Sequence, residues 1–547
     1  MTGETFLTGA QLVVRTLEDL GCTRAVGLPG QHALSLFDAL GQSEITFLGA
    51  RIEHNAGFAA DGAGRSTRTP MPLLLSAGPG TLAVLSAVQE AHDASSPVLV
   101  IAAQVPARGI GGHRHGYLHE LADQAGHYGA LVKDRWSVRS PEQIPSVIAE
   151  AWALAASVPM GPVYVEIPSD VLERPAGGPV PRATARAITT PPLPVLDEVA
   201  ALLGAAQRPV IYAGGGVVRA DAGDELVRVA EALGAPVVTT FGGRSAFPFT
   251  HPLSAAGWIE DIATTELLES ADVLLAVGTG LGELTTNYAT TAPRGTIVQL
   301  DADAAVLGAN YPVIGVHADA KEALDALAYL LPGGDSGSSA DTTASARERI
   351  AAVLQTVEDR LAGQNLAAER RLLDDLRTAV PDDVATFFDM TILGYWSWSA
   401  WDARGGGYEC AQSGGLGWAL GAAMGSAFAT GRPTLAVNGD GGAMYGISEL
   451  ATLTQHRLPV TWLIVDDGGY GVLREYLMAA FGRSTATELA RPDFAALAGS
   501  FGIAARHVGP DGVGEAIAAG IASGEPNVVV VDATLALFAP THLERLA

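Results

Sequence analysis

The stretch "NGDGGAMYGISELATLTQHRLPVTWLIVDDGGYGVLREY" (residues 438–476) decides the fold class, because two turns rich in glycine and acid close two apolar runs. The apolar "TLAV" before it and the "PVTWLIV" inside it are short and bounded by turns, as buried strands of a parallel sheet are. The segment between them has helical character. Since the carboxyl ends of parallel strands meet at one sheet edge, we expect Asp440 and Asp467 to lie close together.

Two carboxylates beside glycine amides make a donor set that suits a divalent cation and phosphate oxygens. The alternative interpretation is that Asp440 and Asp467 are ordinary turn residues in two solvent-exposed loops. The spacing of the two turns leaves both interpretations open.

The composition of the chain limits its partners and its compartment. With 33 Lys+Arg against 59 Asp+Glu, the formal net charge of the 547 residues is −26, so a nucleic-acid partner is not expected. Cys22 and Cys410 are the only cysteines and are far apart, which makes disulfides and zinc sites unexpected. The N-terminus lacks the pattern of a signal peptide and no apolar run reaches membrane-spanning length. We therefore expect a cytoplasmic protein without membrane contact.

Two breaks divide the chain into three blocks. Residues 173–194 ("ERPAGGPVPRATARAITTPPLP") are rich in Pro, Gly and Thr, and residues 332–347 ("PGGDSGSSADTTASAR") have the composition of a linker. In every block, short apolar runs such as "SSPVLVIAAQVP" alternate with amphipathic stretches. This alternation predicts an α/β protein with three doubly wound parallel-sheet domains, which we expect over residues 1–175, 190–332 and 346–547.

The Gly-Asp-Gly turn, followed some two dozen residues later by a second polar turn, resembles the cofactor motif of the thiamine diphosphate enzymes. The departure from that motif is Asp466-Asp467, where the family usually has Asn-Asn. The resemblance implies that Asp440, Asp467 and the carbonyl of Gly469 bind Mg²⁺. It implies that Gly439, Asp440, Gly441, Gly442 and Tyr470 contact the cofactor. The extra carboxylate that Asp466-Asp467 brings in place of Asn-Asn attracts the metal but repels the diphosphate.

Two further segments are similar to the same family. "SGGLGWALGAAMGSAFA" (413–429) resembles its GGLG segment, which implies that Leu416 lies beneath the cofactor and that the Gly414 carbonyl faces the 4′-amino group. Taken alone, it also reads as a Gly/Ala-rich helix packed closely on a sheet. "RIEHNAGFAADGAGRS" places Glu53 at the family's activating glutamate, which implies that its carboxyl group faces N1′ of the aminopyrimidine ring. As an isolated acid, Glu53 reads as a surface charge.

The resemblance covers nearly the whole chain, in the order pyrimidine-binding domain, central Rossmann-like domain and diphosphate-binding domain. In this family Glu53 of one subunit meets Asp440 and Asp467 of another, which implies a homodimer or homotetramer with active sites between subunits. The central "GGG" and "GTGLGE" are reminiscent of a dinucleotide site. However, no GxGxxG follows a strand with an acid about 20 residues further on, so FAD is not expected.

The reaction is predicted from two missing acids. Pyruvate-decarboxylase-like members carry an acid directly after "LPG" and another after the Asn-Asn motif, where this chain has Gln31 and Leu473. Release of an aldehyde is harder without them. The hypothesis is therefore an acetolactate-synthase-like enzyme that decarboxylates a 2-oxo acid and transfers the acyl group to an electrophile. The alternative is a benzoylformate-decarboxylase-like enzyme with His113, His115 or His119 as proton donor.

Two other interpretations stay open. A non-catalytic relative that binds the cofactor is favoured by Asp466-Asp467 and disfavoured by the presence of Glu53 and Leu416. The segment "GYWSWSAW" (394–401) is typical of a core or an interface, and it also fits a lid over the substrate.

Overall fold

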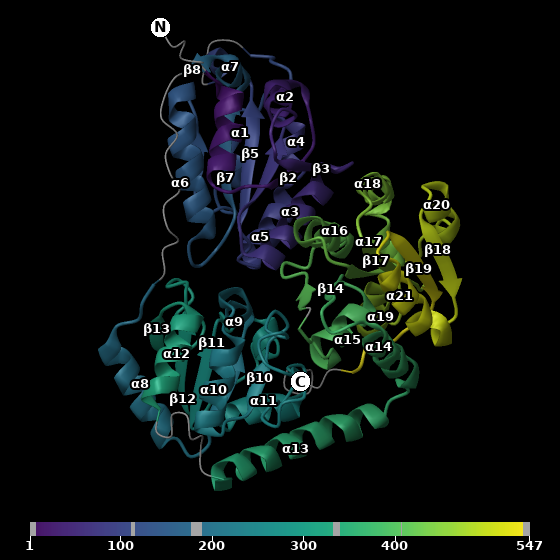
Figure 1. The fold of residues 1–547 in the computed structure, drawn as a ribbon. Coiled ribbons are helices and arrows are strands. Elements are labelled where there is room, and N and C mark those ends of the chain that lie inside the picture. The colour runs from purple at the N-terminus through teal and green to yellow at the C-terminus, as the bar shows by residue number, and fades with distance from the viewer. Residues whose placement is uncertain (1–6, 111–114, 177–188, 332–339, 406, 540–547) are drawn as a thin grey trace.

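The chain forms three α/β domains, each built on a parallel sheet and each following the last along the sequence (Figure 1). A computed structural model describes residues 7–110, 115–176, 189–331, 340–405 and 407–539. The predicted fold class is confirmed in these residues. The expected domain ends at residues 1–6 and 540–547, and the candidate His113, lie outside them.

The N-terminal domain has a six-stranded parallel sheet in the order β3-β2-β4-β5-β7-β6. Its strands are β2 (Arg24–Gly27), β3 (Thr46–Gly49), β4 (Met71–Leu75), β5 (Val98–Gln104), β6 (Arg135–Ser137) and β7 (Val163–Pro168). Its helices are α1 (Gly9–Asp19), α2 (Leu34–Leu40), α3 (Glu53–Thr67), α4 (Pro79–Leu82), α5 (Leu85–Asp93), α6 (Ile144–Ala156) and α7 (Ser169–Glu173). The strand order reverses between β2 and β4, so their loops diverge and leave a crevice at the carboxyl edge.

The C-terminal domain repeats this strand order as β15-β14-β16-β17-β19-β18, with its reversal between β14 and β16. Its strands are β14 (Ala385–Phe388), β15 (Tyr408–Cys410), β16 (Thr434–Gly439), β17 (Val460–Asp466), β18 (Ala504–Val508) and β19 (Asn527–Asp532). Its helices are α14 (Ala367–Ala379), α15 (Ile392–Ala400), α16 (Trp418–Thr430), α17 (Asp440–Ala443), α18 (Leu450–His456), α19 (Gly471–Phe481), α20 (Phe494–Ser500) and α21 (Val513–Ser523).

The central domain has a five-stranded sheet in the order β10-β9-β11-β12-β13. Its strands are β9 (Val210–Ala213), β10 (Val237–Thr239), β11 (Val273–Val277), β12 (Thr296–Asp301) and β13 (Ile314–His317). Its helices are α8 (Leu193–Ala205), α9 (Gly215–Ala220), α10 (Gly223–Leu233), α11 (Ile262–Glu269) and α12 (Ala320–Leu330).

Two local predictions are corrected by the structure. The long helix α13 (Ala340–Ala362) runs from the central domain to the C-terminal domain and begins inside the stretch predicted as a linker (Figure 1). From residue 340 this stretch is rich in Ala and Arg, which favour helix. A short antiparallel pair, β1 (Leu7–Thr8) with β8 (Pro175–Ala176), lies outside the parallel sheets that the pattern predicted.

The N- and C-terminal domains share a core in which α3 packs against α16 (Figure 1). Glycines make this approach close, because a Cβ on Gly62 or Gly425 would clash with the backbone of the facing helix. The Gly/Ala-rich sequence of α16 is thus explained by packing. Trp396, Trp398 and Trp401 are buried in the core that joins the C-terminal and central domains, which confirms the core interpretation of that segment over the lid.

Candidate active site

Asp440 and Asp467 lie where the sequence predicts, at the carboxyl ends of the paired strands β16 and β17. Asp440 is completely buried, and neither of its carboxylate oxygens has a hydrogen-bond partner among the described residues. Burial raises the pKa of Asp440 to about 7, and the nearby carboxylates of Asp467 and Asp466 add to the shift. A divalent cation would remove this electrostatic cost, so the corner fits a bound metal.

The extra acid of the Asp466-Asp467 pair has a partner that the sequence interpretation missed. Arg491 Nε lies 2.7 Å from Asp466 Oδ1 and 3.6 Å from Asp440 Oδ2. Arg474 lies 3.9 Å from Asp467 and 3.0 Å from Glu488. The charge that would repel a diphosphate is therefore offset locally by arginine.

The third ligand of such a metal would be a main-chain oxygen. No group of three or more His, Cys, Asp or Glu side chains with metal-site geometry occurs in the described part of the chain. Gly469 has φ +157° and bridges Glu488, and its neighbour Tyr470 donates its N–H to Thr487 O at 2.8 Å. With its backbone held in this way, the Gly469 carbonyl is the candidate third ligand of the metal, beside the two carboxylates.

The glycines of the Gly-Asp-Gly corner leave no room for side chains. A Cβ on Gly441 would lie 2.7 Å from the Tyr470 ring, and one on Gly439 would lie 3.1 Å from Thr391 Oγ1. A Cβ on Gly442 would clash with the carboxylate of Asp389. The corner thus presents backbone to a ligand, as phosphate-binding turns do.

Two buried carboxylates from different domains hold the segment that carries Gly414 and Leu416. At its C-terminal end, Asp389 accepts hydrogen bonds from Gly417 N at 3.1 and 2.9 Å and from Asn438 Nδ2 at 2.5 Å. At its N-terminal end, Glu90 of α5 accepts hydrogen bonds from Gln412 N at 2.5 Å, Ser413 N at 3.0 Å and Ser413 Oγ at 2.5 Å. Gly414 (φ +79°) and the half-buried Leu416 lie between these two anchors.

Glu90 is itself held by a buried ion network. Arg65 Nη2 lies 2.7 Å from Glu90 and 2.8 Å from Asp61, and all three side chains are fully inaccessible. Trp418 Nε1 donates to Asp61 at 2.8 Å, and the guanidinium of Arg65 lies 4.6 Å from the Trp418 ring centroid. The network ties α3, α5 and α16 together, so the position of the Gly414–Leu416 segment depends on the N-terminal domain.

The N-terminal candidates gather at the turn that follows β4. Glu53 is the first residue of α3, and its Oε1 would lie 3.4 Å from a Cβ on Gly80. The main chain of His119 packs against Gly78 of the same turn, where a Cβ would clash with it. The structure thus places Glu53 and His119 at one crevice, next to the reversal between β2 and β4.

The other two predicted catalytic residues are placed differently. Gln31 opens the short 3₁₀-helix η1 (Gln31–Ala33) after β2 with an exposed side chain. The side chain of His115 is 85% exposed and lies 3.4 Å from Glu120. Its placement gives no support to the prediction that His115 is a proton donor. His32, beside Gln31, is half-buried at the crevice and was missed by the sequence interpretation.

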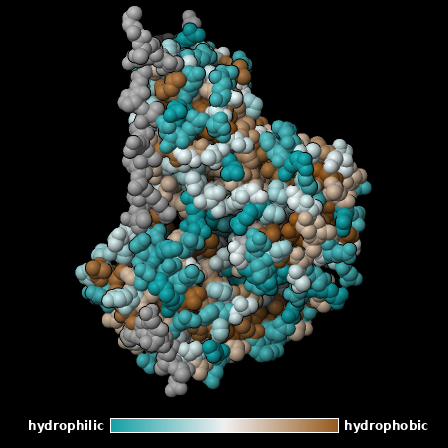
Figure 2. Space-filling view, viewed as in Figure 1, coloured by the Kyte–Doolittle hydropathy of each residue, from teal (hydrophilic) through white to brown (hydrophobic). Residues whose placement is uncertain are grey.

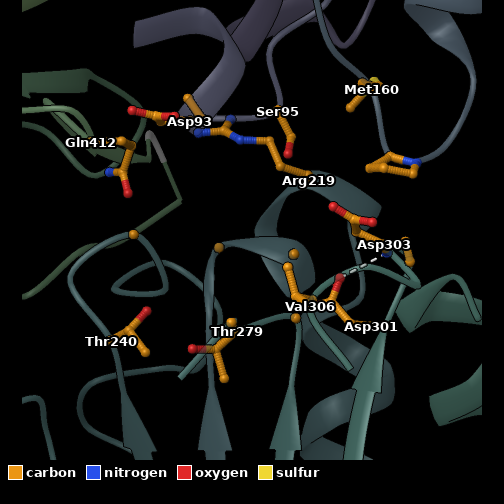
Figure 3. Close-up of a pocket in the computed structure, with 18 of the residues that line it drawn as sticks. Asp93, Ser95, Met160, Arg219, Thr240, Thr279, Asp301, Asp303, Val306 and Gln412 are labelled. Carbon is orange, nitrogen blue, oxygen red and sulfur yellow. Dashed lines mark hydrogen bonds between the residues drawn. The ribbon is translucent and has the colours of Figure 1, made fainter. Parts of the chain in front are cut away.

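A second cavity of about 570 Å³ lies at the carboxyl ends of the central-domain strands, between the three domains (Figure 3). The glycines of "GGG" and "GTG" that line it are explained by mutual close packing. The amides of Gly214, Gly216 and Gly278 already donate to Val277 O, Gly278 O and Leu300 O. They are therefore unavailable to a phosphate.

The charged residues around this cavity do not fit a diphosphate either. The two basic side chains at its wall are engaged, because Lys133 Nζ donates to four protein oxygens and Arg219 donates to both oxygens of Glu409. The wall also carries the carboxylates of Asp93, Glu283, Asp301, Asp303 and Asp319. The donor set of this cavity thus disagrees with the diphosphate of FAD.

Comparison with known families places all three domains. Residues 7–127 match the model of the thiamine pyrophosphate enzyme N-terminal TPP binding domain. Residues 196–327 match the central domain of thiamine pyrophosphate enzymes, and residues 392–531 match their C-terminal TPP binding domain. The chain belongs to the thiamine pyrophosphate enzyme family. Glu53 and His119 fall in the first matched domain, and Asp440 and Asp467 fall in the last.

Curated relatives agree with this assignment along most of the chain. A probable 2-ketoarginine decarboxylase from Pseudomonas aeruginosa is 32% identical over 91% of this chain and 89% of its own length. An acetolactate synthase from Mycobacterium bovis is 32% identical over 91% of this chain and 83% of its own length. The large subunit of acetolactate synthase isozyme 1 from Escherichia coli is 29% identical over 91% and 88%. The protein is a thiamine pyrophosphate-dependent enzyme. None of its described helices is long and apolar enough to cross a membrane.

Proposed function

We propose that the protein uses thiamine diphosphate and Mg²⁺ to decarboxylate a 2-oxo acid and to transfer its acyl group to an electrophile. The observation that carries the cofactor assignment is the completely buried carboxylate of Asp440, which lies beside Asp467 and has no hydrogen-bond partner among the described residues. Bound there, the cofactor supplies the carbon that carries the acyl group. The acetolactate synthases among the relatives support the transfer step.

The metal-binding and cofactor-binding candidates and Glu53 each have a role in this proposal. Asp440, Asp467 and the Gly469 carbonyl hold the metal, while Arg491 offsets the charge of Asp466. The backbone of Gly439, Gly441 and Gly442 receives the diphosphate, and Tyr470 closes that side. The Gly414 carbonyl and the Leu416 side chain orient the ring system, and Glu53 holds the proton that activates it.

Transfer of the acyl group is favoured over release of an aldehyde, because the two positions that carry acids in pyruvate-decarboxylase-like members carry none here. Leu473 is apolar and half-exposed, and Gln31 has no proton to give at neutral pH. The second candidate is a decarboxylase that releases an aldehyde. It is favoured by His119, which lies at the crevice of Glu53, and by the similarity to a probable 2-ketoarginine decarboxylase.

We propose a homodimer or homotetramer in which Glu53 of one subunit meets the metal corner of another. Large apolar side chains that are exposed in the N-terminal domain and in the C-terminal domain support this assembly, because such surfaces mark interfaces. They are Leu34, Ile52 and Leu118 in the N-terminal domain, and Met444, Tyr445, Leu473, Tyr476, Met478 and Phe481 in the C-terminal domain. The face shown in Figure 2 carries brown, hydrophobic patches among hydrophilic residues.

We further propose that the central domain is architectural and carries no FAD. The support is the donor set of its cavity, in which the amides of Gly216 and Gly278 and the side chains of Lys133 and Arg219 are engaged by the protein, and five carboxylates remain at the wall.

A panel of 2-oxo acids, each with and without an acceptor aldehyde or a second 2-oxo acid, tests the reaction by mass spectrometry. We expect carbon dioxide and a ligated 2-hydroxy ketone or 2-hydroxy acid product that requires thiamine diphosphate and Mg²⁺. Free aldehyde alone, in the presence of every acceptor, would favour the decarboxylase. Absence of cofactor-dependent turnover with the whole panel would favour the non-catalytic relative.

A further inference from the structure

Two imidazoles from separate loops face each other at the crevice beside Glu53. The ring centroids of His32 and His119 are 5.3 Å apart, with the planes inclined at 47°. His32 lies in η1 after β2, and His119 precedes the 3₁₀-helix η3 (Ala125–Tyr128). His119 has φ +64°, which is strained for a non-glycine residue and is kept by close packing against Gly78. Strain of this kind is concentrated at functional sites.

The two rings are oriented in the same way with respect to solvent. The Nδ1 atom of each is buried without a hydrogen-bond partner among the described residues, whereas neither Nε2 atom is among the buried unpartnered atoms. Neither Nε2 atom forms a hydrogen bond with a described residue, so each is available to a ligand. A buried N–H without an acceptor is costlier than a buried lone pair without a donor. In the neutral form of each ring we therefore assign the proton to Nε2.

A third donor joins the pair. Ser76, the residue that follows β4, has a buried and unpartnered Oγ. A Cβ on Gly30 would clash with the Ser76 side chain, and a Cβ on Gly80 would lie 3.9 Å from Ser76 Cβ and 3.4 Å from Glu53 Oε1. The two imidazoles and the Ser76 hydroxyl thus belong to the loops that lie beside the proposed catalytic glutamate.

We propose that His32 and His119, with Ser76, bind the carboxylate of the 2-oxo acid; the identity of this ligand rests on the proposed function. An anion suits a site of this kind because all three groups donate hydrogen bonds and charge-assisted bonds are the stronger ones. Burial, followed by the neighbouring His119, lowers the pKa of His32, which disfavours a charged His32 imidazole.

Calorimetry with oxamate, an analogue of pyruvate that cannot lose carbon dioxide, tests the site on the purified protein without thiamine diphosphate. We expect binding that weakens at least tenfold in His32→Asn and in His119→Asn. His127→Asn, an exposed histidine of the same domain, is the matched control and should stay within twofold. In the cofactor-loaded enzyme, His32→Asn should raise KM at least tenfold while kcat changes less than threefold.

The outcomes separate this inference from the proposed function. Oxamate binding that depends on His32 in a protein that never binds thiamine diphosphate would sustain the carboxylate site and refute the cofactor assignment. Cofactor-dependent turnover with an unchanged KM in His32→Asn would refute the carboxylate site alone. Loss of oxamate binding on addition of a chelator would also refute it, because the imidazoles would then be metal ligands. Thermal melting of each variant checks that it is folded.

Discussion

Replacing Glu90 by Gln is the most informative single change outside the cofactor corner. Glu90 accepts three hydrogen bonds from residues 412–413 and pairs with Arg65 at 2.7 Å, and its side chain is fully buried. The amide keeps the size of the side chain but removes its charge. Because the segment it anchors carries Gly414 and Leu416, both stability and cofactor binding should suffer.

The size of the effect follows from the contacts of Glu90. Breaking a buried ion pair costs about 3–5 kcal/mol, and hydrogen bonds to charged groups contribute about 1.5–3 kcal/mol against about 0.5–1.5 for neutral ones. Arg65 keeps Asp61 at 2.8 Å and Glu409 at 3.4 Å, so the loss should fall at the lower end of that range. We expect Glu90→Gln to lower the free energy of unfolding by about 3 kcal/mol.

Urea unfolding followed by tryptophan fluorescence measures this loss, since Trp418 packs on Arg65. Glu358→Gln is the matched control, because it removes the charge from a half-exposed pair with Arg370 at 2.8 Å and should cost less than about 1 kcal/mol. Titration of both variants with thiamine diphosphate at saturating Mg²⁺ should show weaker binding only for Glu90→Gln. Equal stability and equal cofactor affinity of the two variants would refute the anchoring role.

Three further predictions concern the charges of the metal corner and the central cavity. Because the pKa of Asp440 is raised from 3.8 to about 7, the folded, metal-free protein keeps a proton that the unfolded chain loses. The free energy of unfolding should therefore fall as the pH rises from about 4 to about 7. Mg²⁺ with thiamine diphosphate should reverse this fall, and melting curves measured across this pH range test both effects. Arg491→Met should weaken thiamine diphosphate binding about tenfold, or about 1.4 kcal/mol, and Asp466→Asn in the same chain should restore it; calorimetry that finds no restoration would contradict the pairing. The purified protein should lack the visible absorption of a flavin, and a protein purified with bound FAD would disprove the interpretation of the central cavity.

Local sequence was sufficient for the fold and for the placement of Asp440 and Asp467 at one sheet edge. Short apolar runs closed by glycine turns specify parallel strands, and Asp440 and Asp467 follow consecutive neighbours in the sheet, β16 and β17. Their approach therefore depends on a single crossover connection. The cofactor was inferred from the resemblance to a family, and local sequence alone did not indicate it.

Residues that act across domains could not be predicted from the sequence. Glu90 sits in "AVQEAHDA", where an acid reads as part of a solvated helix face, and only the packing of α5 near residues 412–413 buries it. Asp389 lies some 50 positions before its partner Asn438. His32 faces His119 and Arg491 pairs with Asp466, and only the fold brings these partners near them. The missed residues are those whose partners are distant in sequence.

The central claim is that Asp440 and Asp467 hold a metal-bound diphosphate while Glu53 activates the ring attached to it. Calorimetric titration with thiamine diphosphate, with and without Mg²⁺, tests it most directly on the wild type and on Asp440→Asn and Glu53→Gln. We expect binding by the wild type only when Mg²⁺ is present, loss of binding in Asp440→Asn, and near-normal binding without turnover in Glu53→Gln. Metal-independent binding, or unchanged binding by Asp440→Asn, would contradict it.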